Sequence, residues 1–201
     1  MTDKDLIRKD VLSRRDAISG ELKKTKDISI RERLLGLPEF STSAVILLYA
    51  SFKSEVDTFE AIRYCLSNNK TVVLPRVNET KDALILYEIK DISELARGHF
   101  GVPEPSVSED RRRDISGLDL VIVPGVAFDE GCNRLGYGKG FYDKLFSPIS
   151  NQQSAVSNNR RKTCRIALAY EEQIVERIPA EPHDMKMDKI ITDKRTITCN
   201  G

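Results

Sequence analysis

Short apolar runs alternate with polar segments of helical spacing along this chain of 201 residues. The apolar runs are continuous, which is typical of strands whose two faces are both covered by helices. We therefore expect a mostly parallel sheet. The runs that predict its strands are residues 44–50, 71–74, 84–89, 120–123, 165–169 and 189–191.

Helical periodicity marks two segments before the first strand. In residues 4–19, the side chains of Ile7, Val11 and Ile18 fall on one face of a helix. A second helix is predicted over residues 21–35, because a glycine and a proline follow it closely and are typical of a helix end.

A third predicted helix separates the first two strands. It begins after Asp57 or Thr58, either of which can cap it, and runs to about residue 66. The order of strand, helix and strand predicts a right-handed crossover between parallel neighbours. The proline that follows residues 71–74 is expected to end the second strand.

Two polar stretches predict connections rather than strands or helices. Residues 101–116 hold two prolines and three consecutive arginines, so they predict a surface connection. Residues 147–162 are rich in Asn, Gln and Ser and predict a mobile loop. No repeat or interdomain linker is visible. Residues 1–201 are therefore predicted to form one α/β domain with three layers.

The loop after the strand at 120–123 combines glycines on alternate positions with two cations and a carboxylate. Glycines let a backbone approach phosphates closely, and cations offset their charge. A neighbouring carboxylate can hold the magnesium ion of a nucleotide. The loop therefore predicts a nucleotide-using enzyme. Its residues are Gly136, Gly138, Gly140, Arg134, Lys139 and Asp143.

This loop departs from the two common phosphate-binding motifs. In a Walker A loop, serine or threonine follows the lysine, whereas Gly140 follows Lys139 here. A Rossmann fingerprint requires a third glycine where this chain has Phe141. A tight turn whose glycines only supply positive φ therefore stays open as an alternative. That alternative does not explain the charged residues in the loop.

Composition narrows the class of protein. The chain carries 32 basic and 31 acidic residues, a net charge of +1, which argues against a nucleic-acid binder. No apolar run approaches the roughly 20 residues of a membrane helix. The first residues lack the apolar core of a signal peptide, so we expect a cytoplasmic protein.

The cysteines form no C-x-x-C pair and no zinc-finger spacing with histidine. We expect all four, Cys65, Cys132, Cys164 and Cys199, to be free thiols in a reducing compartment. Cys132 lies in the glycine-rich region, but no histidine near it in sequence could activate it as a nucleophile.

Several segments resemble one family. PGVAFDEGCNRLGYGKGFYDK at 124–144 and EPHDMKMDKIIT at 181–192 resemble the 5-formyltetrahydrofolate cyclo-ligases, also called methenyltetrahydrofolate synthetases. The resemblance extends to Lys4-x-x-x-Arg8, to SFKSEVDT at 51–58 and to LPR at 74–76. Two departures are mild: Phe141 stands where the family often has tyrosine, and Cys132 where it often has glycine.

The resemblance implies a Rossmann-like α/β sandwich and a reaction. Such enzymes use ATP and Mg²⁺ to convert 5-formyltetrahydrofolate to 5,10-methenyltetrahydrofolate, with release of ADP and phosphate. ATP phosphorylates the formyl oxygen, and N10 then closes the ring. The protein must mainly position the γ-phosphate and stabilise its charge.

The resemblance also implies roles for individual residues. Arg134 and Lys139 would be catalytic. Asp143 and Asp184 would bind the metal, with Asp188 as an alternative to Asp184. The residues implied for ATP are Lys4, Arg8, Arg134, Leu135, Gly136, Tyr137, Gly138, Lys139, Gly140, Phe141 and Tyr142.

The folate would lie between the segment at 51–58, which follows the first predicted strand, and the glycine loop. Phe52 offers an aromatic face, and a carboxylate such as Asp57 or Glu55 can bond pterin nitrogens. Arg76 is a candidate partner for the glutamate tail. The residues implied for folate are Phe52, Glu55, Asp57, Tyr137, Gly138, Lys139, Gly140 and Phe141.

Other interpretations remain open from the sequence. Phe52 could belong to the core, Asp57 could only cap a helix, and Asp184 could only cap a turn. Lys4 and Arg8 could form a solvated helix face. A binding protein without turnover, or a transferase for sugar phosphates or CoA, are the competing functions. We expect a monomer, because no heptad pattern predicts a coiled coil.

Overall fold

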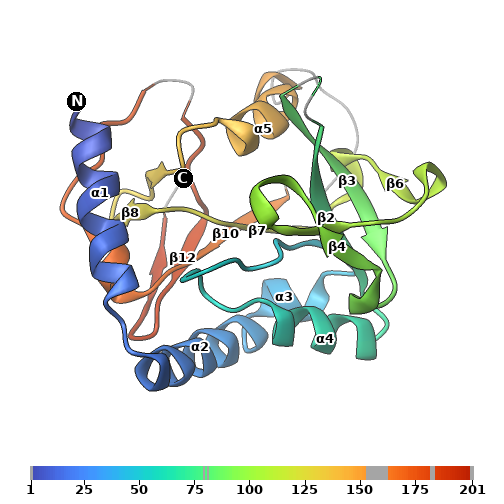
Figure 1. Cartoon of the computed structure of the whole chain (residues 1–201), viewed down its shortest axis with the longest axis horizontal. Helices are drawn as coiled ribbons and strands as arrows, with labels where there is room; N and C mark the ends of the chain where they lie inside the picture. The colour runs from blue at the N-terminus through green and yellow to red at the C-terminus, as the bar shows by residue number, and fades with distance from the viewer. Residues whose placement is uncertain (1, 79, 81, 153–162, 182–183, 200–201) are drawn as a thin grey trace.

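The computed structural model describes residues 2–78, 80, 82–152, 163–181 and 184–199 (Figure 1). The helices are α1 (Asp3–Asp16), α2 (Gly20–Leu35), α3 (Pro38–Thr42), α4 (Phe59–Ser67) and α5 (Phe141–Gln152). The strands are β1 (Val45–Leu47), β2 (Thr71–Asn78), β3 (Ala83–Ile89), β4 (Leu95–Arg97), β5 (Pro103–Pro105), β6 (Arg112–Arg113), β7 (Leu120–Val123), β8 (Ala127–Asp129), β9 (Arg134–Leu135), β10 (Cys164–Leu168), β11 (Ile174–Val175), β12 (Lys189–Ile191) and β13 (Thr196–Thr198).

The main sheet has eight strands in the order β13-β12-β10-β7-β1-β2-β3-β6. The five central strands, from β12 to β2, run parallel to one another. β13 and β3 flank them in antiparallel pairing, and β6 pairs with β3. The prediction of a mostly parallel sheet, with α4 in the crossover between β1 and β2, is confirmed.

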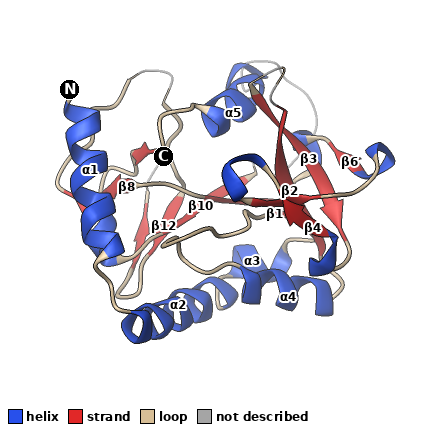
Figure 2. Ribbon diagram, viewed as in Figure 1, coloured by secondary structure: helices blue, strands red, loops and turns tan. Residues whose placement is uncertain are grey.

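Helices cover both faces of this sheet (Figure 2). Ile46 and Leu48 pack in one core cluster with Ile30 of α2, and Leu47 packs in another cluster with Phe146 of α5. Neighbouring residues of a strand thus face opposite layers, and both faces are buried. This explains the continuous apolar runs and confirms the predicted three-layer arrangement.

Several element boundaries differ from the prediction: β1, for example, covers only Val45–Leu47 of the run at 44–50. Two of the differences have clear reasons. α1 ends at Asp16 rather than at residue 19, because Ser19 caps α2 and accepts a hydrogen bond from the Leu22 amide at 3.4 Å. β2 continues through Pro75 to Asn78. The pairing of β2 with β1 ends before Pro75, so the missing proline N–H leaves no bond unmade on that side.

The predicted connections contain more structure than their composition indicates. Residues 101–116 include β5 and β6, and Arg111 in this region makes two hydrogen bonds to Glu94, at 2.6 and 3.0 Å. The helix α5 continues to Gln152, so the loop predicted from residue 147 is wrong for its first residues. Phe146 of α5 packs in the core, and a helix anchored by such packing can continue through polar residues. Residues 153–162 lie outside the described part of the chain.

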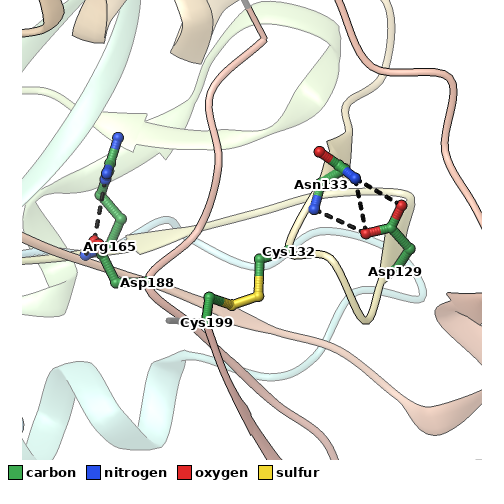
Figure 3. The surroundings of a disulfide bond; sticks show 6 residues. All are labelled: Asp129, Cys132, Asn133, Arg165, Asp188 and Cys199. Atoms are coloured by element: carbon green, nitrogen blue, oxygen red, sulfur yellow. Dashed lines mark hydrogen bonds and ion pairs between the residues drawn. A yellow bond between two sulfur atoms is a disulfide. The ribbon is translucent and has the colours of Figure 1, made fainter. Parts of the chain in front are cut away.

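The expectation of four free thiols is wrong for two of them. Cys132 and Cys199 form a disulfide, with their Cα atoms 6.0 Å apart (Figure 3). Cys65 and Cys164 are free, as predicted. The partners lie 67 residues apart in the sequence, and only the fold brings the turn after β8 beside the segment after β13. Pairing of this kind is not readable from cysteine spacing.

Reduction of this disulfide is expected to lower the thermal stability. A bond that closes a loop of 67 residues stabilises a protein by about 4 kcal/mol in the chain-entropy model. Thermal unfolding with and without dithiothreitol measures the effect. The variant Cys199→Ser should match the reduced wild type and show no response to the reductant. Equal unfolding midpoints for the oxidised and reduced wild type would contradict the expected stabilisation.

Within the described residues, no helix has both the length and the apolar character needed to cross a bilayer.

Candidate active site

Two cavities lie at the carboxyl ends of the parallel strands. β7 leads through Pro124 into the glycine loop, and β1 leads into the loop at residues 48–58. A crevice beyond this edge is the usual ligand site of an open α/β sheet. We call them the glycine-loop cavity and the aromatic cavity.

The glycine-loop cavity has a volume of about 390 Å³ and unites the residues predicted for ATP and metal. They come from α1, from β9 and the glycine loop after it, from the first turn of α5, and from the segment near the C-terminus. Pro124 and Lys144 complete the lining. The predicted residues in it are Lys4, Arg8, Arg134, Leu135, Gly136, Tyr137, Gly138, Lys139, Gly140, Phe141, Tyr142, Asp143 and Asp184.

Cations and carboxylates are paired within this cavity. The Arg134 guanidinium is 2.8 Å from Asp143, and its side chain is 4% exposed. The Lys4 ammonium is 2.9 Å from Asp184 and 3.0 Å from Glu181. Burial would lower the pKa of Lys4, but its hydrogen bonds to Asp184 and Glu181 outweigh burial and raise that pKa. Both predicted metal carboxylates are therefore neutralised by predicted phosphate ligands.

Arg8 connects α1 to the glycine loop through a hydrogen bond. Its Nε donates to the Gly136 carbonyl at 2.9 Å, and its guanidinium lies 2.8 Å from Asp5. Gly138 has a φ of +96°, a conformation that L side chains rarely adopt, and its α-carbon faces Arg8. Glycine at 138 is thus required by the turn itself, whether or not a ligand approaches it.

Buried donors in this cavity lack partners within the described residues. Arg134 Nε and Tyr142 Oη are both buried without a hydrogen bond. Buried polar atoms are normally satisfied, so an orphaned donor in a cavity wall is suited to a polar ligand. Lys139 differs from these groups because it is exposed at the border of both cavities.

The carboxylates fit magnesium that arrives with a nucleotide. The described residues contain no group of three or more His, Cys, Asp or Glu that could hold a metal ion. Mg²⁺ is usually held by one or two carboxylates together with phosphate oxygens. Asp143 and Asp184 meet that requirement. Asp188 does not line the cavity, and its carboxylate accepts from the Arg165 amide at 2.8 Å and Arg165 Nε at 3.1 Å (Figure 3).

Asp184 also stabilises the turn in which it lies. Its carboxylate accepts a hydrogen bond from the Glu181 amide at 2.9 Å, so the capping role considered from the sequence is present beside the ion pair with Lys4. The two roles use the same oxygen, Oδ2. His183 lies outside the described residues.

The aromatic cavity has a volume of about 410 Å³ and adjoins the first. The predicted folate residues Phe52, Glu55, Tyr137, Lys139 and Phe141 line it. Gly138 and Gly140 line only the glycine-loop cavity. The wall that both cavities share consists of Pro124, Tyr137, Lys139, Phe141 and Tyr142.

Glu55 is held with its carboxylate in the aromatic cavity. One oxygen accepts from the Tyr137 hydroxyl at 2.6 Å, and the other accepts from the Phe52 amide at 2.9 Å. Burial raises the pKa of Glu55, although these hydrogen bonds and nearby cations oppose the increase. The two hydrogen bonds thus fix the Glu55 carboxylate in position at the wall of the aromatic cavity.

Two predicted residues lie elsewhere. Asp57 lines neither cavity, and its Oδ1 accepts from the Phe59 amide at 3.2 Å at the start of α4. Arg76 also lines neither cavity, and its guanidinium lies over the Tyr87 ring and 2.9 Å from Glu109. The structure therefore supports the helix-capping interpretation of Asp57 and gives Arg76 partners other than a ligand.

Sequence reasoning missed several residues of the aromatic cavity. Arg15 comes from α1, and His99, Phe100 and Glu104 come from the region around β4 and β5. Phe100 has a φ of +54° and is 74% exposed, and burial raises the pKa of Glu104. Of these, Glu104 falls in the surface connection predicted over residues 101–116, and His99 and Phe100 precede it. Their place beside the cavity depends on the pairing of β4 with β5, which the sequence does not reveal.

Comparisons with known proteins agree with this geometry. The family model described as "5-formyltetrahydrofolate cyclo-ligase family" matches residues 1–193. The 5-formyltetrahydrofolate cyclo-ligase of Haemophilus influenzae is 32% identical over 164 residues, covering 81% of this chain and 83% of the relative. The mouse enzyme of that name is 28% identical over 190 residues, covering 92% and 91%.

Solved structures show the same similarity in three dimensions. The 5,10-methenyltetrahydrofolate synthetase of Aquifex aeolicus superposes with a TM-score of 0.82 at 32% identity, over 100% of this chain and 94% of that chain. The synthetase of Mycoplasma pneumoniae gives a TM-score of 0.72 at 25% identity, over 96% and 99%. With its fold, its paired cavities and the match over residues 1–193, the chain belongs to the 5-formyltetrahydrofolate cyclo-ligase family.

Proposed function

We propose that this protein converts 5-formyltetrahydrofolate to 5,10-methenyltetrahydrofolate with ATP and Mg²⁺. The observation that carries the proposal is the wall shared by the two cavities, with Lys139 exposed at their border. One cavity has cations and a glycine loop that suit phosphates, and the other has aromatic faces that suit a pterin. Membership of the family supports the same reaction.

In the proposed reaction, the two substrates react across the shared wall. The γ-phosphoryl group of ATP is transferred to the formyl oxygen, and ADP leaves. The N10 amine attacks the formyl carbon and loses its proton. The bond from carbon to the phosphorylated oxygen then breaks, and phosphate leaves as the ring closes. A γ-phosphate on one side of the wall and a formyl group on the other would meet at Lys139.

The residues of the chain have distinct tasks in this proposal. Lys139 and Arg134 stabilise the charge of the transferring phosphoryl group, and Lys4 and Arg8 hold the nucleotide from α1. Bound magnesium would neutralise phosphate charge, with Asp143 and Asp184 as its carboxylate ligands. Glycine amides of the loop add hydrogen-bond donors to the phosphates.

The folate is held by a different set of residues. Phe52 and Tyr137 supply ring faces, Phe141 contributes to the shared wall, and the Glu55 carboxylate bonds pterin nitrogens. Asp57 supports the site only through the loop that it orders at the start of α4.

An absorbance assay for methenyltetrahydrofolate tests the proposal. Purified protein with 5-formyltetrahydrofolate, ATP and magnesium should form the product, and omission of either ATP or magnesium should abolish it. The protein treated with a chelator, and then given magnesium again, is the matched control. Binding of folate and nucleotide without any turnover would identify a non-catalytic relative instead.

We also propose the setting in which the protein works. The whole chain would act as one domain and as a monomer in the cytoplasm, without nucleic acid or a membrane as partner. In a reducing cytoplasm the Cys132–Cys199 pair would be present as thiols for part of the time. Sedimentation of the purified protein measures its oligomeric state.

A further inference from the structure

Arg15 is a buried cation at the end of α1 that borders the aromatic cavity. It is 4% exposed, and charged side chains are almost never so buried unless they are paired. Its Nε donates to Ser54 Oγ at 3.0 Å, and its Nη1 donates to Tyr137 Oη at 2.9 Å. The guanidinium carbon lies 5.8 Å from the centre of the Tyr137 ring.

Each hydroxyl that accepts a hydrogen bond from Arg15 donates its own proton to a carboxylate. Ser54 Oγ bonds the Asp16 carboxylate, and Tyr137 Oη bonds Glu55 Oε1 at 2.6 Å. The charge of Arg15 is thus balanced through two bridging hydroxyls. A buried arginine arranged in this way orders its neighbours, because both hydroxyls must keep their orientation to satisfy it.

The chemistry of the donors fixes where the Tyr137 proton points. Arginine has only N–H donors, and a phenol has a single O–H proton. Since Arg15 occupies the acceptor side of the Tyr137 oxygen, the hydroxyl proton is directed to Glu55. The Phe52 amide bonds the other oxygen of Glu55, so the carboxylate is held from both ends.

We propose that Arg15 is the positioning residue of the folate site, and that it acts through the Tyr137 hydroxyl to hold the Glu55 carboxylate against the substrate's pterin ring. This inference rests on the proposed function, because it names which residues prepare that site for folate. Arg15 itself need not touch the substrate. It differs from Lys4 and Arg8, which lie on the same helix but line only the glycine-loop cavity.

Electrostatics around Glu55 point in the same direction. Burial raises the pKa of Glu55, and Arg15 is one of the groups that oppose this effect. Loss of Arg15 should raise that pKa further. The acid limit of folate binding, which is the pH below which affinity falls, should then move to higher pH. The reason is that a protonated Glu55 carboxyl no longer accepts hydrogen bonds from the pterin N–H groups. The charged and titratable groups that act on or face Glu55 are Arg15, Lys23, Tyr49, Tyr137 and Tyr142.

A double-mutant cycle tests the inference with 5-formyltetrahydrofolate as the probe. Arg15→Met and Tyr137→Phe should each weaken binding, measured by calorimetry, about 10- to 100-fold, the range for a lost hydrogen bond involving a charged group. The affinity of the double variant should be no lower than that of the single variant with the lower affinity. Both changes break the same series of hydrogen bonds, from Arg15 through Tyr137 to Glu55. Arg14→Met is the matched control, since Arg14 is exposed and paired with Asp10 at 2.9 Å.

The possible outcomes separate the hypotheses. Wild-type affinity in Arg15→Met, or losses that add in the double variant, would overturn the inference. A wild-type protein that binds no 5-formyltetrahydrofolate would instead contradict the proposed function. If Arg15→Met does not fold, the pH profile of folate binding by Tyr137→Phe decides. An acid limit at higher pH than in the wild type supports the inference, and an unchanged limit overturns it.

Discussion

Replacement of Lys139 by alanine is expected to reduce turnover on the order of 10²- to 10³-fold at saturating ATP. Lys139 lies in the wall that both cavities share, and in the proposed mechanism its charge stabilises the phosphoryl group as it passes from ATP to the formyl oxygen. Its ammonium is exposed, so the change removes a charge without opening a cavity in the core. Folding should therefore be preserved.

The measurement compares steady-state turnover with thermal unfolding. Lys24→Ala is the matched control, because Lys24 is an exposed lysine of α2 that lines neither cavity. It should leave turnover and stability near those of the wild type. Nearly normal turnover in Lys139→Ala at saturating ATP would remove Lys139 from the phosphoryl-transfer step.

Arg134→Ala should give a loss of similar size in turnover, with a cost in stability as well. The Arg134 side chain is 4% exposed and pairs with Asp143, which would lose its partner. Breaking a buried pair leaves one charge uncompensated. The unfolding midpoint of Arg134→Ala should therefore fall below that of Lys139→Ala, which distinguishes the two cations experimentally.

The sequence predicted which residues would line the glycine-loop cavity where those residues are close together in the chain. Arg134, Lys139 and Asp143 occur within ten positions with the glycines, so their proximity needed no knowledge of the fold. The strand at 120–123 that presents this loop matches β7 at both ends. Its residues are fully buried on both faces, which is the condition under which an apolar run is easiest to recognise.

Residues whose role depends on long-range packing could not be predicted in this way. Arg15 is one of several arginines near the N-terminus, and only the approach of Tyr137 and Ser54 makes it a buried member of the site. The same limit applies to the Cys132–Cys199 pair and to the short strands β8, β9 and β11, which form a separate small sheet. Their partners are set by tertiary structure rather than by local sequence.

Magnesium should bind this protein weakly in the absence of nucleotide. Both carboxylates predicted for the metal are already paired, Asp184 with Lys4 and Asp143 with Arg134. Nucleotide phosphates can take over both cations and release both carboxylates for the metal. Nucleotide and magnesium should therefore bind cooperatively, and by linkage each should increase the affinity for the other by the same factor.

Asp143→Asn is expected to raise the magnesium concentration for half-maximal activity by about 10-fold or more, because loss of even an outer-shell partner of a metal ligand weakens metal binding that much. Asp184→Asn should change it in the same direction. Asparagine can still accept the Glu181 amide bond at the turn, so the variant removes the charge and keeps the cap. Calorimetric titration of nucleotide at several magnesium concentrations gives the same comparison without turnover.

Asp10→Asn is the matched control for both variants, because Asp10 is also an aspartate paired with an arginine and lines neither cavity. Its magnesium curve should coincide with that of the wild type. An unchanged magnesium curve for Asp143→Asn or Asp184→Asn would remove that residue from the metal site. Tight magnesium binding by the nucleotide-free wild type would contradict the idea that nucleotide phosphates must first take Lys4 and Arg134 away from the two carboxylates. The ion pairs with Lys4 and Arg134 would then not compete with the metal.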